Sequence, residues 1–336
     1  MRSPSALSLL LILNLIACDG EAGAAGPTGP EGPAGPQGAA GPAGAPAPDG
    51  RIAIHLPGAT FYPEGMAVSS DGTFYVGSVG TGAIARVPPH ALGAVPFVEG
   101  KAAFGVYGME VDAAHNTLWA CTYDDNLAPA QPAYLTGYSL ATGMQVASFK
   151  LPGDNGGCND VALDPAGNVY ATDSFANAIV RLPLGGSALQ TWSTSALYEV
   201  EPGNFSLTGI AYDGAQGLYV VNYTTNKLIH VPIQADGSAG TAVDVPVTPA
   251  LDGPDGLELV DTHTLLAVEN PAGQASLVRL ADGKGAKAVL ANGYTEPTAA
   301  AVYQGSAWVL EGQLSYLFGA PGRPSLPFRA YRVALP

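Results

Sequence analysis

A two-strand pattern recurs six times between residues 65 and 311, and this repeat constrains the fold more than any other sequence feature. In each copy a short alternating strand leads into an Asp/Asn/Gly-rich turn and then a more apolar strand. One large residue marks the second strand of each copy: Tyr75, Trp119, Tyr170, Tyr219, Leu266 and Trp308. Their spacings of 44, 51, 49, 47 and 42 residues fit one four-stranded blade per copy. The sequence therefore predicts an all-β protein, a six-bladed β-propeller over residues 51–336, rather than a sandwich or solenoid.

The two ends of the predicted propeller also have the character of strands. Residues 51–56 and 329–335 are rich in apolar residues and lie outside the repeat unit. Pairing the first segment into the last blade would close the ring and remove free sheet edges.

Composition agrees with a protein of strands and turns that does not bind nucleic acid. The chain has 44 Gly and 29 Pro among 336 residues and only 12% charged residues, which favours short strands over helices. Asp and Glu number 28 against 13 Lys and Arg, so the net charge is −15. Nucleic-acid binding needs Lys and Arg to neutralise phosphates, so cations are the more natural small partners. Three Cys are too few for a four-cysteine zinc site.

The first residues predict a processed leader and a lipid anchor. Arg2 precedes an apolar stretch that ends in LIAC at residues 15–18, which resembles the bacterial lipobox, in which the Cys becomes the acylated N-terminus. We therefore expect a lipoprotein signal peptide over residues 1–17, lipidation of Cys18 and a place in the bacterial cell envelope, anchored to the membrane outside the cytoplasm. The alternative is an ordinary secretory signal that contains a Cys.

Nine consecutive Gly-X-Y triplets follow Cys18, with Gly at every third position from 20 to 44. This strict period is collagen-like, because only Gly fits at the axis of a triple helix. We expect residues 18–50 to form a stalk, and two alternatives stay open. A single extended chain of ~3.1 Å per residue would carry a monomeric propeller, whereas a short triple helix would make a trimer.

One polar position per copy is predicted to meet at a mouth of the central channel, if the first strand of each blade is innermost. We call these six residues the mouth ring: Glu64, Tyr107, Asn159, Thr208, Asp255 and Thr298. Carboxylate and amide oxygens without a His or Cys group suit a hard cation such as Ca²⁺ better than zinc or copper. The alternative is that these residues only make turns.

A second position is polar in all six copies, three residues after the large residue of the second strand. We call these residues the second set: Ser78, Thr122, Asp173, Asn222, Glu269 and Glu311.

Three short motifs resemble the senescence-marker-protein/gluconolactonase (regucalcin-like) family, to which squid-type phosphotriesterases and, more distantly, paraoxonases are similar. The motifs are YPEG at 62–65, GCNDVALD at 157–164 and GPDGL at 253–257. The resemblance implies a six-bladed propeller that uses Ca²⁺ to hydrolyse lactones, other esters or organophosphates. It implies metal ligands at Glu64, Asn159 and Asp255, and a general base or nucleophile at Asp255. The chain departs from the family in blade four, where Thr208 replaces a ligand Asn and is a weaker donor; Asn204 or a water are alternatives there.

Two functions are therefore open. The first is a surface-tethered, calcium-dependent hydrolase of lactones or related esters, in which the cation polarises the carbonyl and Asp255 or Asp173 activates water or attacks. The second is a non-catalytic propeller lipoprotein that binds a ligand or another protein through the same mouth. The sequence contains no Gly-x-Ser-x-Gly or His-Glu-x-x-His motif that would indicate another hydrolytic mechanism.

Cys121 and Cys158 are expected to approach the same face, at the end of one strand of blade two and just before blade three. In an oxidising compartment they could form a disulfide. The alternative is two separate buried thiols, because Cα atoms more than ~7 Å apart cannot be bridged.

Overall fold

We describe a computed structural model of the chain, which covers residues 50–124, 132–154 and 156–336. These residues belong to one compact unit. The predicted signal peptide, Cys18 and the stalk up to residue 49 lie outside the described residues, so those predictions stay as they are. No helix in the described part of the chain is long and apolar enough to span a membrane.

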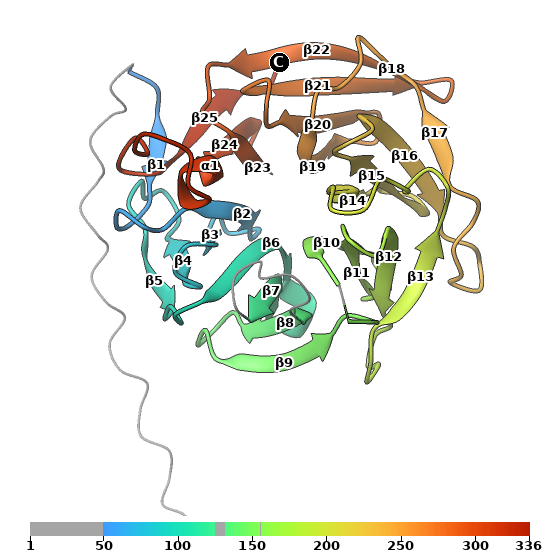
Figure 1. Ribbon diagram of the computed structural model, residues 1–336, viewed down its shortest axis with the longest axis horizontal. Helices are drawn as coiled ribbons and strands as arrows, with labels where there is room; N and C mark the ends of the chain where they lie inside the picture. The colour runs from blue at the N-terminus through green and yellow to red at the C-terminus, as the bar shows by residue number, and fades with distance from the viewer. Residues whose placement is uncertain (1–49, 125–131, 155) are drawn as a thin grey trace, which may run out of the picture. The chain divides into compact units, whose positions relative to one another are not determined.

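Six sheets, antiparallel except for one short edge strand, are arranged as blades around a central axis (Figure 1), which confirms the predicted six-bladed propeller. We number the blades one to six by their inner strands, which are β2 (Pro63–Val68), β6 (Phe104–Asp112), β10 (Cys158–Leu163), β14 (Leu207–Tyr212), β19 (Pro254–Asp261) and β23 (Pro297–Tyr303). Each inner strand packs against the inner strand of the next blade, and β23 packs against β2. The inner strands therefore form a closed ring.

Three further strands extend each blade outward. The second strands are β3 (Phe74–Ser78), β7 (Thr117–Asp124), β11 (Val169–Asp173), β15 (Gly217–Asn222), β20 (Thr264–Glu269) and β24 (Ser306–Glu311). The third strands are β4 (Ile84–Val87), β8 (Ala133–Ser139), β12 (Ala178–Leu182), β16 (Lys227–Pro232), β21 (Gln274–Ala281) and β25 (Arg329–Ala334). The outer strands are β5 (Val95–Val98), β9 (Gln145–Lys150), β13 (Gln190–Thr194), β17 (Val243–Val245), β22 (Lys284–Asn292) and β1 (Ala53–His55).

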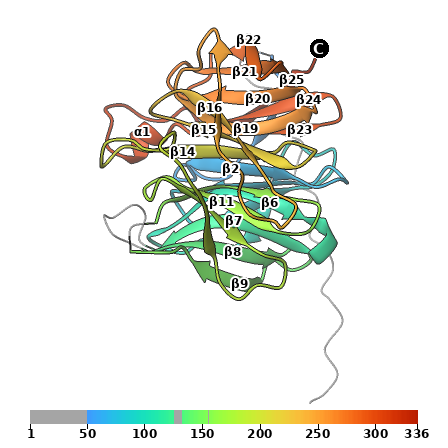
Figure 2. The same cartoon turned by 90° about the vertical axis from the view of Figure 1, so that its right-hand side faces the viewer.

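Three short elements lie outside the four-strand pattern of the blades. The strand β18 (Val247–Thr248) pairs in parallel with β22 at the outside of blade five. A 3₁₀ helix, η1 (Ala113–His115), joins β6 to β7, and α1 (Leu314–Leu317) lies between β24 and β25. Figure 2 shows α1 projecting from one face of the ring.

The ring closes through the first strand, as the sequence predicts. β1 pairs antiparallel with β25, with Ala53 opposite Tyr331, and becomes the outer strand of blade six. One expectation is corrected: residues 329–334 are the third strand of blade six rather than a strand outside the repeat, because 17 residues that include α1 separate β24 from β25. The Arg51 guanidinium lies 4.0 Å from the centre of the Tyr331 ring, a cation–π contact beside this closure.

The hydrophobic core is divided into six clusters, one between each pair of neighbouring blades. Tyr170 of blade three, for example, packs in one cluster with Leu218 of blade four, and both are fully buried. Both faces of a blade are therefore covered. This explains why the second strands are apolar along their length instead of alternating between apolar and polar residues.

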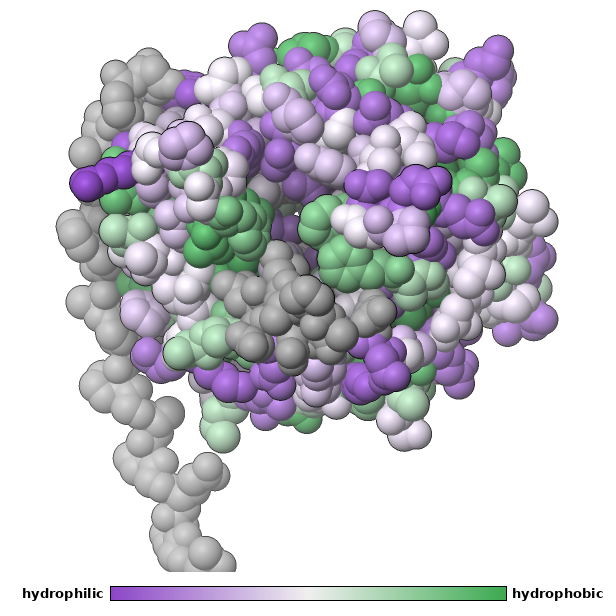
Figure 3. Space-filling model, viewed as in Figure 1, coloured by the Kyte–Doolittle hydropathy of each residue, from purple (hydrophilic) through white to green (hydrophobic). Residues whose placement is uncertain are grey.

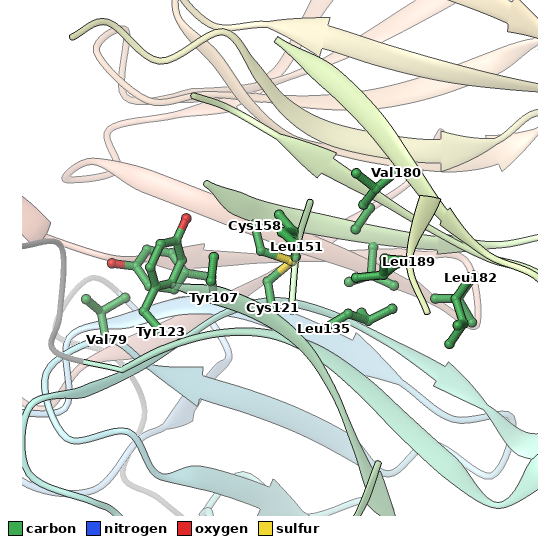
Figure 4. Packing of buried hydrophobic residues seen from close by; sticks show 14 residues of the cluster. Val79, Tyr107, Cys121, Tyr123, Leu135, Leu151, Cys158, Val180, Leu182 and Leu189 are labelled. Atoms are coloured by element: carbon green, nitrogen blue, oxygen red, sulfur yellow. A yellow bond between two sulfur atoms is a disulfide. The ribbon is translucent and has the colours of Figure 1, made fainter. Parts of the chain in front are cut away.

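Cys121 and Cys158 form a disulfide between blades two and three (Figure 4), with their Cα atoms 5.1 Å apart. The expectation that the two residues lie close is confirmed. Of the two alternatives, a disulfide or two separate thiols, the structure contains the disulfide. The cystine is buried among Leu135, Leu151 and other residues of the cluster shared by these blades.

Candidate functional site

Every inner strand changes register with its second strand at the mouth ring. In blade one, Pro63 pairs with Ser78 and Met66 with Val76, so the inner strand holds one extra residue, as in a β-bulge. The other five inner strands show the same shift, and each shift brackets that blade's member of the mouth ring. A bulge bends a strand and re-aims its side chain. The repeat therefore places all six ring residues in an equivalent, irregular backbone position.

Glycine follows the ring residue in blades one, two, four and five because neighbouring inner strands nearly touch. A Cβ atom on Gly65 would lie 2.1 Å from the carbonyl oxygen of Tyr107, and one on Gly209 would lie 2.4 Å from that of Asp255. Neither contact is possible without moving backbone. These glycines let the six inner strands close around a narrow axis.

Blade three has Asp160 at this glycine position. Its carboxylate accepts hydrogen bonds from the backbone N–H of Val161 (2.9 Å) and of Ile210 in blade four (3.3 Å). A Cβ on Gly108 would lie 2.3 Å from Oδ1 of Asp160, so the carboxylate occupies the space beside blade two. Asp160 therefore puts a carboxyl group at the one repeat position where blades one, two, four and five have glycine.

The four predicted metal-site residues line one cavity of about 330 Å³. Glu64, Asn159, Thr208 and Asp255 come from blades one, three, four and five, and Tyr107 of blade two joins them. The remaining described lining residues are Phe205, Tyr223, Asn270, Glu296, Leu314, Ser315 and Phe318. The structure thus brings together the residues that the sequence singled out, while their roles stay predictions.

The two carboxylates of the mouth ring repel each other in a buried site. Burial, followed by the charges of Asp255 and Asp160, raises the pKa of Glu64 well above its ordinary value. Burial and the charge of Asp160 raise the pKa of Asp255 to about 8, against a hydrogen bond from Asn270. A positive charge placed among these groups would favour their ionised forms.

Several polar atoms of the ring lack a protein partner. The hydroxyl groups of Tyr107 and Thr298 are buried and have no hydrogen-bond partner in the described part of the chain. No described residue donates a hydrogen bond to the Glu64 carboxylate. Thr208 donates its hydroxyl proton to the carbonyl oxygen of Pro254 (2.9 Å), which leaves the oxygen lone pairs for another group. This oxygen-only donor set fits a hard cation such as Ca²⁺.

No group of three or more His, Cys, Asp and Glu side chains among the residues that the structure covers could hold a metal ion. A cation at the mouth ring would therefore need the amide oxygen of Asn159 and the hydroxyl of Thr208, or water, in addition to Glu64 and Asp255.

Asp173, the second candidate base, lies in a different environment. Its Oδ1 atom accepts hydrogen bonds from the backbone N–H groups of Gly157 (2.7 Å), Phe175 (3.3 Å) and Ala176 (3.0 Å). It is not among the described residues that line the 330 Å³ cavity. Asp173 therefore stabilises the backbone around the entry to blade three. Asn204, the alternative donor in blade four, is exposed and also absent from the described lining.

Three carboxylates deeper along the axis were missed by the sequence reasoning. Asp160, Glu110 and Glu258 line a second cavity of about 200 Å³. A constriction of about 20 Å³, lined by residues that include Glu64, Asp160, Asp255 and Glu258, shares residues with both cavities. Burial raises the pKa values of Asp160 and Glu110 to about 7 each.

The repeat alignment contained a signal for these groups. Glu110 and Glu258 stand three residues after Tyr107 and Asp255, where the other four copies have alanine: Ala67, Ala162, Ala211 and Ala301. Asp160 stands where four copies have glycine. Departures from a small residue at a repeated position mark the side chains that enter the axis.

Comparison with known proteins identifies the fold. The sequence matches no family model and no curated protein. Similar solved structures include a gluconolactonase from Xanthomonas campestris, with 16% identity over 85% of this chain and 88% of that chain and a TM-score of 0.60. A luciferin-regenerating enzyme has 12% identity over 85% and 95% of the two chains, with a TM-score of 0.60. A chain of a nidogen/laminin complex has 19% identity over 77% and 97%, with a TM-score of 0.57.

Enzymes and a protein of a nidogen/laminin complex thus share this architecture, so the fold by itself does not select a function. What the comparisons and the strand order establish together is the architecture: the chain has a six-bladed propeller fold that it shares with a gluconolactonase and a luciferin-regenerating enzyme, in agreement with the fold that its motifs predicted.

Proposed function

We propose that this protein is a calcium-dependent hydrolase of lactones or related esters that acts at the mouth of the propeller. The observation that carries the proposal is the convergence of Glu64, Asn159, Thr208 and Asp255, from four different blades, on one cavity. The likeness to a gluconolactonase supports the same reaction class.

Glu64, Asn159 and Asp255 would hold the cation, with the Thr208 hydroxyl as a fourth, weaker donor. When bound, Ca²⁺ supplies positive charge that polarises a carbonyl group and stabilises negative charge on its oxygen. The raised pKa values of Glu64 and Asp255 describe the cost of holding two buried carboxylates together without such a charge.

Asp255 is the residue we assign as general base. Oδ2 of Asp255 accepts a hydrogen bond from Nδ2 of Asn270 (3.4 Å), and Asn270 also donates to the carbonyl oxygen of Pro297 (3.2 Å). Asn270 thereby fixes the orientation of the carboxylate, which would take a proton from the attacking water.

Tyr107 would act as a hydrogen-bond donor to the substrate. Burial, and then the charge of Glu64, raises the pKa of Tyr107 well above its ordinary value, so the hydroxyl keeps its proton at neutral pH. The hydroxyl is buried without a partner among the described residues, and Tyr107 is one of the residues that line the cavity. A donor of this kind would stabilise negative charge that develops on a carbonyl oxygen.

The cell-envelope location is part of the proposal. The Cys121–Cys158 disulfide supports an oxidising compartment outside the cytoplasm. Acylation of Cys18 and the Gly-X-Y stalk would tether the propeller to the membrane. Labelled fatty acid should appear on the wild type and not on Cys18→Ser, and an unlabelled wild type would contradict the anchor.

The alternative is a non-catalytic propeller that binds a ligand or a protein partner. Thr208 favours this alternative, since it replaces an expected Asn ligand with a weaker donor. A propeller in a nidogen/laminin complex shows the same fold outside the hydrolases.

Calcium content and lactone hydrolysis of the mature protein, with CaCl₂ or EDTA, test the proposal. We expect bound calcium, and hydrolysis that EDTA abolishes. Asp255→Asn should abolish turnover, whereas Asp252→Asn, at an exposed residue just before β19, should retain it. A protein that neither binds calcium nor hydrolyses any lactone or ester would contradict the proposal and leave the binding alternative.

A further inference from the structure

The wall of the 330 Å³ cavity above the mouth ring is apolar and largely aromatic. Phe205, Tyr223, Leu314 and Phe318 line it, and the first and last of these are exposed, whereas Glu64 and Thr208 of the polar floor are buried. Figure 3 shows apolar surface on both sides of the mouth. The cavity therefore combines a polar floor with an apolar entrance.

Exposed phenylalanine is concentrated at this mouth. All nine Phe of the chain are described, and three of them are exposed: Phe175 (39%), Phe205 (40%) and Phe318 (55%). Phe205 and Phe318 line the cavity, and the ring of Phe175 lies 5.2 Å from that of Phe205. Phe205 also contacts Tyr223, with the ring centres 6.5 Å apart. Aromatic side chains gathered around a cavity and left open to water are typical of a ligand site.

Phe205, Leu314 and Phe318 offer no hydrogen-bond partner to a hydroxyl group, and the described lining offers no positively charged side chain to a negatively charged ligand. The described lining contains no Lys or Arg and includes Glu64, Asp255 and Glu296. Glu296 accepts a hydrogen bond from the backbone N–H of Ser315 (2.8 Å), and Asn270 donates to Asp255 and Pro297. Those hydroxyls of a polyhydroxylated ligand that face Phe205, Leu314 or Phe318 would have no partner, and each unpaired group costs about 1–3 kcal/mol.

We infer that the substrate is an uncharged lactone or ester that carries an apolar group, a short alkyl chain or a single aromatic ring, rather than a sugar lactone. This inference rests on the proposed function and adds the substrate class to it. The carbonyl end lies over the polar floor, and the apolar group lies between Phe205 and Phe318. A volume of about 330 Å³ is near the lower end of small-molecule sites, which limits the apolar group to a small one.

A series of δ-lactones tests the inference in the mature, calcium-loaded protein. The probes are δ-valerolactone, δ-hexalactone and δ-octalactone, with D-glucono-δ-lactone as the hydroxylated member. We expect kcat/KM to rise about threefold to fourfold for each added CH₂ that is buried, and to be lowest for D-glucono-δ-lactone. A preference for D-glucono-δ-lactone, or equal values along the series, would overturn the inference and leave the hydrolase proposal intact.

Variants of the wall test the assignment to Phe205 and Phe318. We expect Phe205→Ala and Phe318→Ala each to lower kcat/KM for δ-octalactone about tenfold while leaving δ-valerolactone within twofold of wild type. The matched control is Met144→Ala, which removes a side chain that is 69% exposed between β8 and β9. Equal loss for both lactones in the Phe variants would indicate a general effect on the fold and contradict the assignment.

A binding measurement separates this inference from the hydrolase proposal. If no lactone is hydrolysed, the hydrolase proposal is wrong, and 2-alkylcyclohexanones, which cannot be hydrolysed, replace the lactones as probes. A rise in melting temperature that grows with alkyl length and is reduced in Phe318→Ala would retain the apolar ligand class. No shift with any of these ketones would overturn the inference as well.

Discussion

The second set and the mouth ring each place one residue at an equivalent position in all six blades, but the two sets differ in the hydrogen-bond partners that the protein supplies to them. The three carboxylates of the second set bind the backbone of the loop that enters their own blade: Asp173 accepts from Gly157, Glu269 from Asp252, and Glu311 from Thr295. The mouth ring instead includes Tyr107 and Thr298, whose buried hydroxyls have no partner in the described residues, and the repelling carboxylates of Glu64 and Asp255.

The two sets meet at the bulge. Each second-set residue pairs with the residue that directly precedes the ring residue, as Ser78 does with Pro63 and Asp173 with Cys158. A polar residue at a repeated position is therefore insufficient evidence of function. How much of its hydrogen-bonding capacity the protein already uses helps to separate a residue that stabilises the fold from one that is available to a ligand, although Oδ2 of Asp173 is also buried without a partner among the described residues.

The largest effect is expected at Glu269 in the second set. Its carboxylate is fully buried and bonds Nζ of Lys287 (2.8 Å), which is itself 8% exposed, and Ser276. Burial opposes ionisation of Glu269, yet these hydrogen bonds lower its pKa below the ordinary value. Glu269→Ala should lower the free energy of unfolding by about 3–5 kcal/mol, because it leaves a buried ammonium unpaired.

Urea denaturation measures this effect, and Glu269→Ala combined with Lys287→Met is the control. The double variant removes both charges and should recover much of the lost stability. If Glu269→Ala were as stable as wild type, the second set would not have the stabilising role that distinguishes it from the mouth ring.

Calcium gives the next largest effect, now in the mouth ring. At a hundredfold excess over Kd, the ion should raise the free energy of unfolding by about 2.7 kcal/mol. Melting temperatures with EDTA and with CaCl₂ measure the shift. Asp255→Asn or Glu64→Gln should weaken it, whereas Glu269→Ala should retain it in any protein that still folds. Equal calcium shifts in wild type and Asp255→Asn would contradict the assignment of the ring.

The deep carboxylates predict a pH dependence of stability. Burial raises the pKa of Glu110 to about 7. A carboxyl group with a raised pKa holds its proton in the folded state after the unfolded state has lost it, so stability falls as pH rises from about 4.5 to 7. Glu110→Gln should flatten this fall by about 1–3 kcal/mol, since one unit of pKa corresponds to ~1.4 kcal/mol. Denaturation of the EDTA-treated protein at pH 5 and pH 8 measures it, and an unchanged slope would contradict the prediction.

The smallest effect is expected for Asp173→Asn. The amide keeps an oxygen for the N–H groups of Gly157 and Ala176 but loses the charge, so we expect about 1 kcal/mol of destabilisation. Lactone hydrolysis should stay within twofold of wild type. A loss of activity as large as that of Asp255→Asn would restore Asp173 as a catalytic candidate.

The sequence predicted the ring because each blade repeats its turn and strand chemistry. Tyr75 and its equivalents mark the second strands, and Glu64, Asn159, Thr208 and Asp255 were found through one shared offset. Their common cavity follows from the closed ring of inner strands, which the repeat number already implied.

The alignment of the six sequence repeats could not predict the apolar wall of the cavity. Phe205 lies in a connection between blades, and Leu314 and Phe318 lie in the segment between β24 and β25, which has no counterpart in other blades. The sequences of these segments do not recur from blade to blade, so the repeat gives no information about them. Their place over the mouth depends on contacts such as the hydrogen bond from Ser315 to Glu296, which only the folded chain reveals.

The closing strand β1 is the part of the propeller that would receive a pulling force applied through the N-terminal tether. Its ladder with β25 spans three residues, Ala53–His55, and one further backbone hydrogen bond lies on each side of it, from Arg332 to Ile52 and from Leu56 to Phe328. The last residue of β1 also bridges to Gly93 of blade one. Since β1 directly follows the predicted tether, tension along that tether would load this short ladder before any other part of the sheet. A force that peels β1 away would expose the edge of β25 and leave blades six and one joined by the packing of β23 on β2 and by their shared core cluster. The seam that completes the propeller is therefore also the place where pulling would begin to undo it.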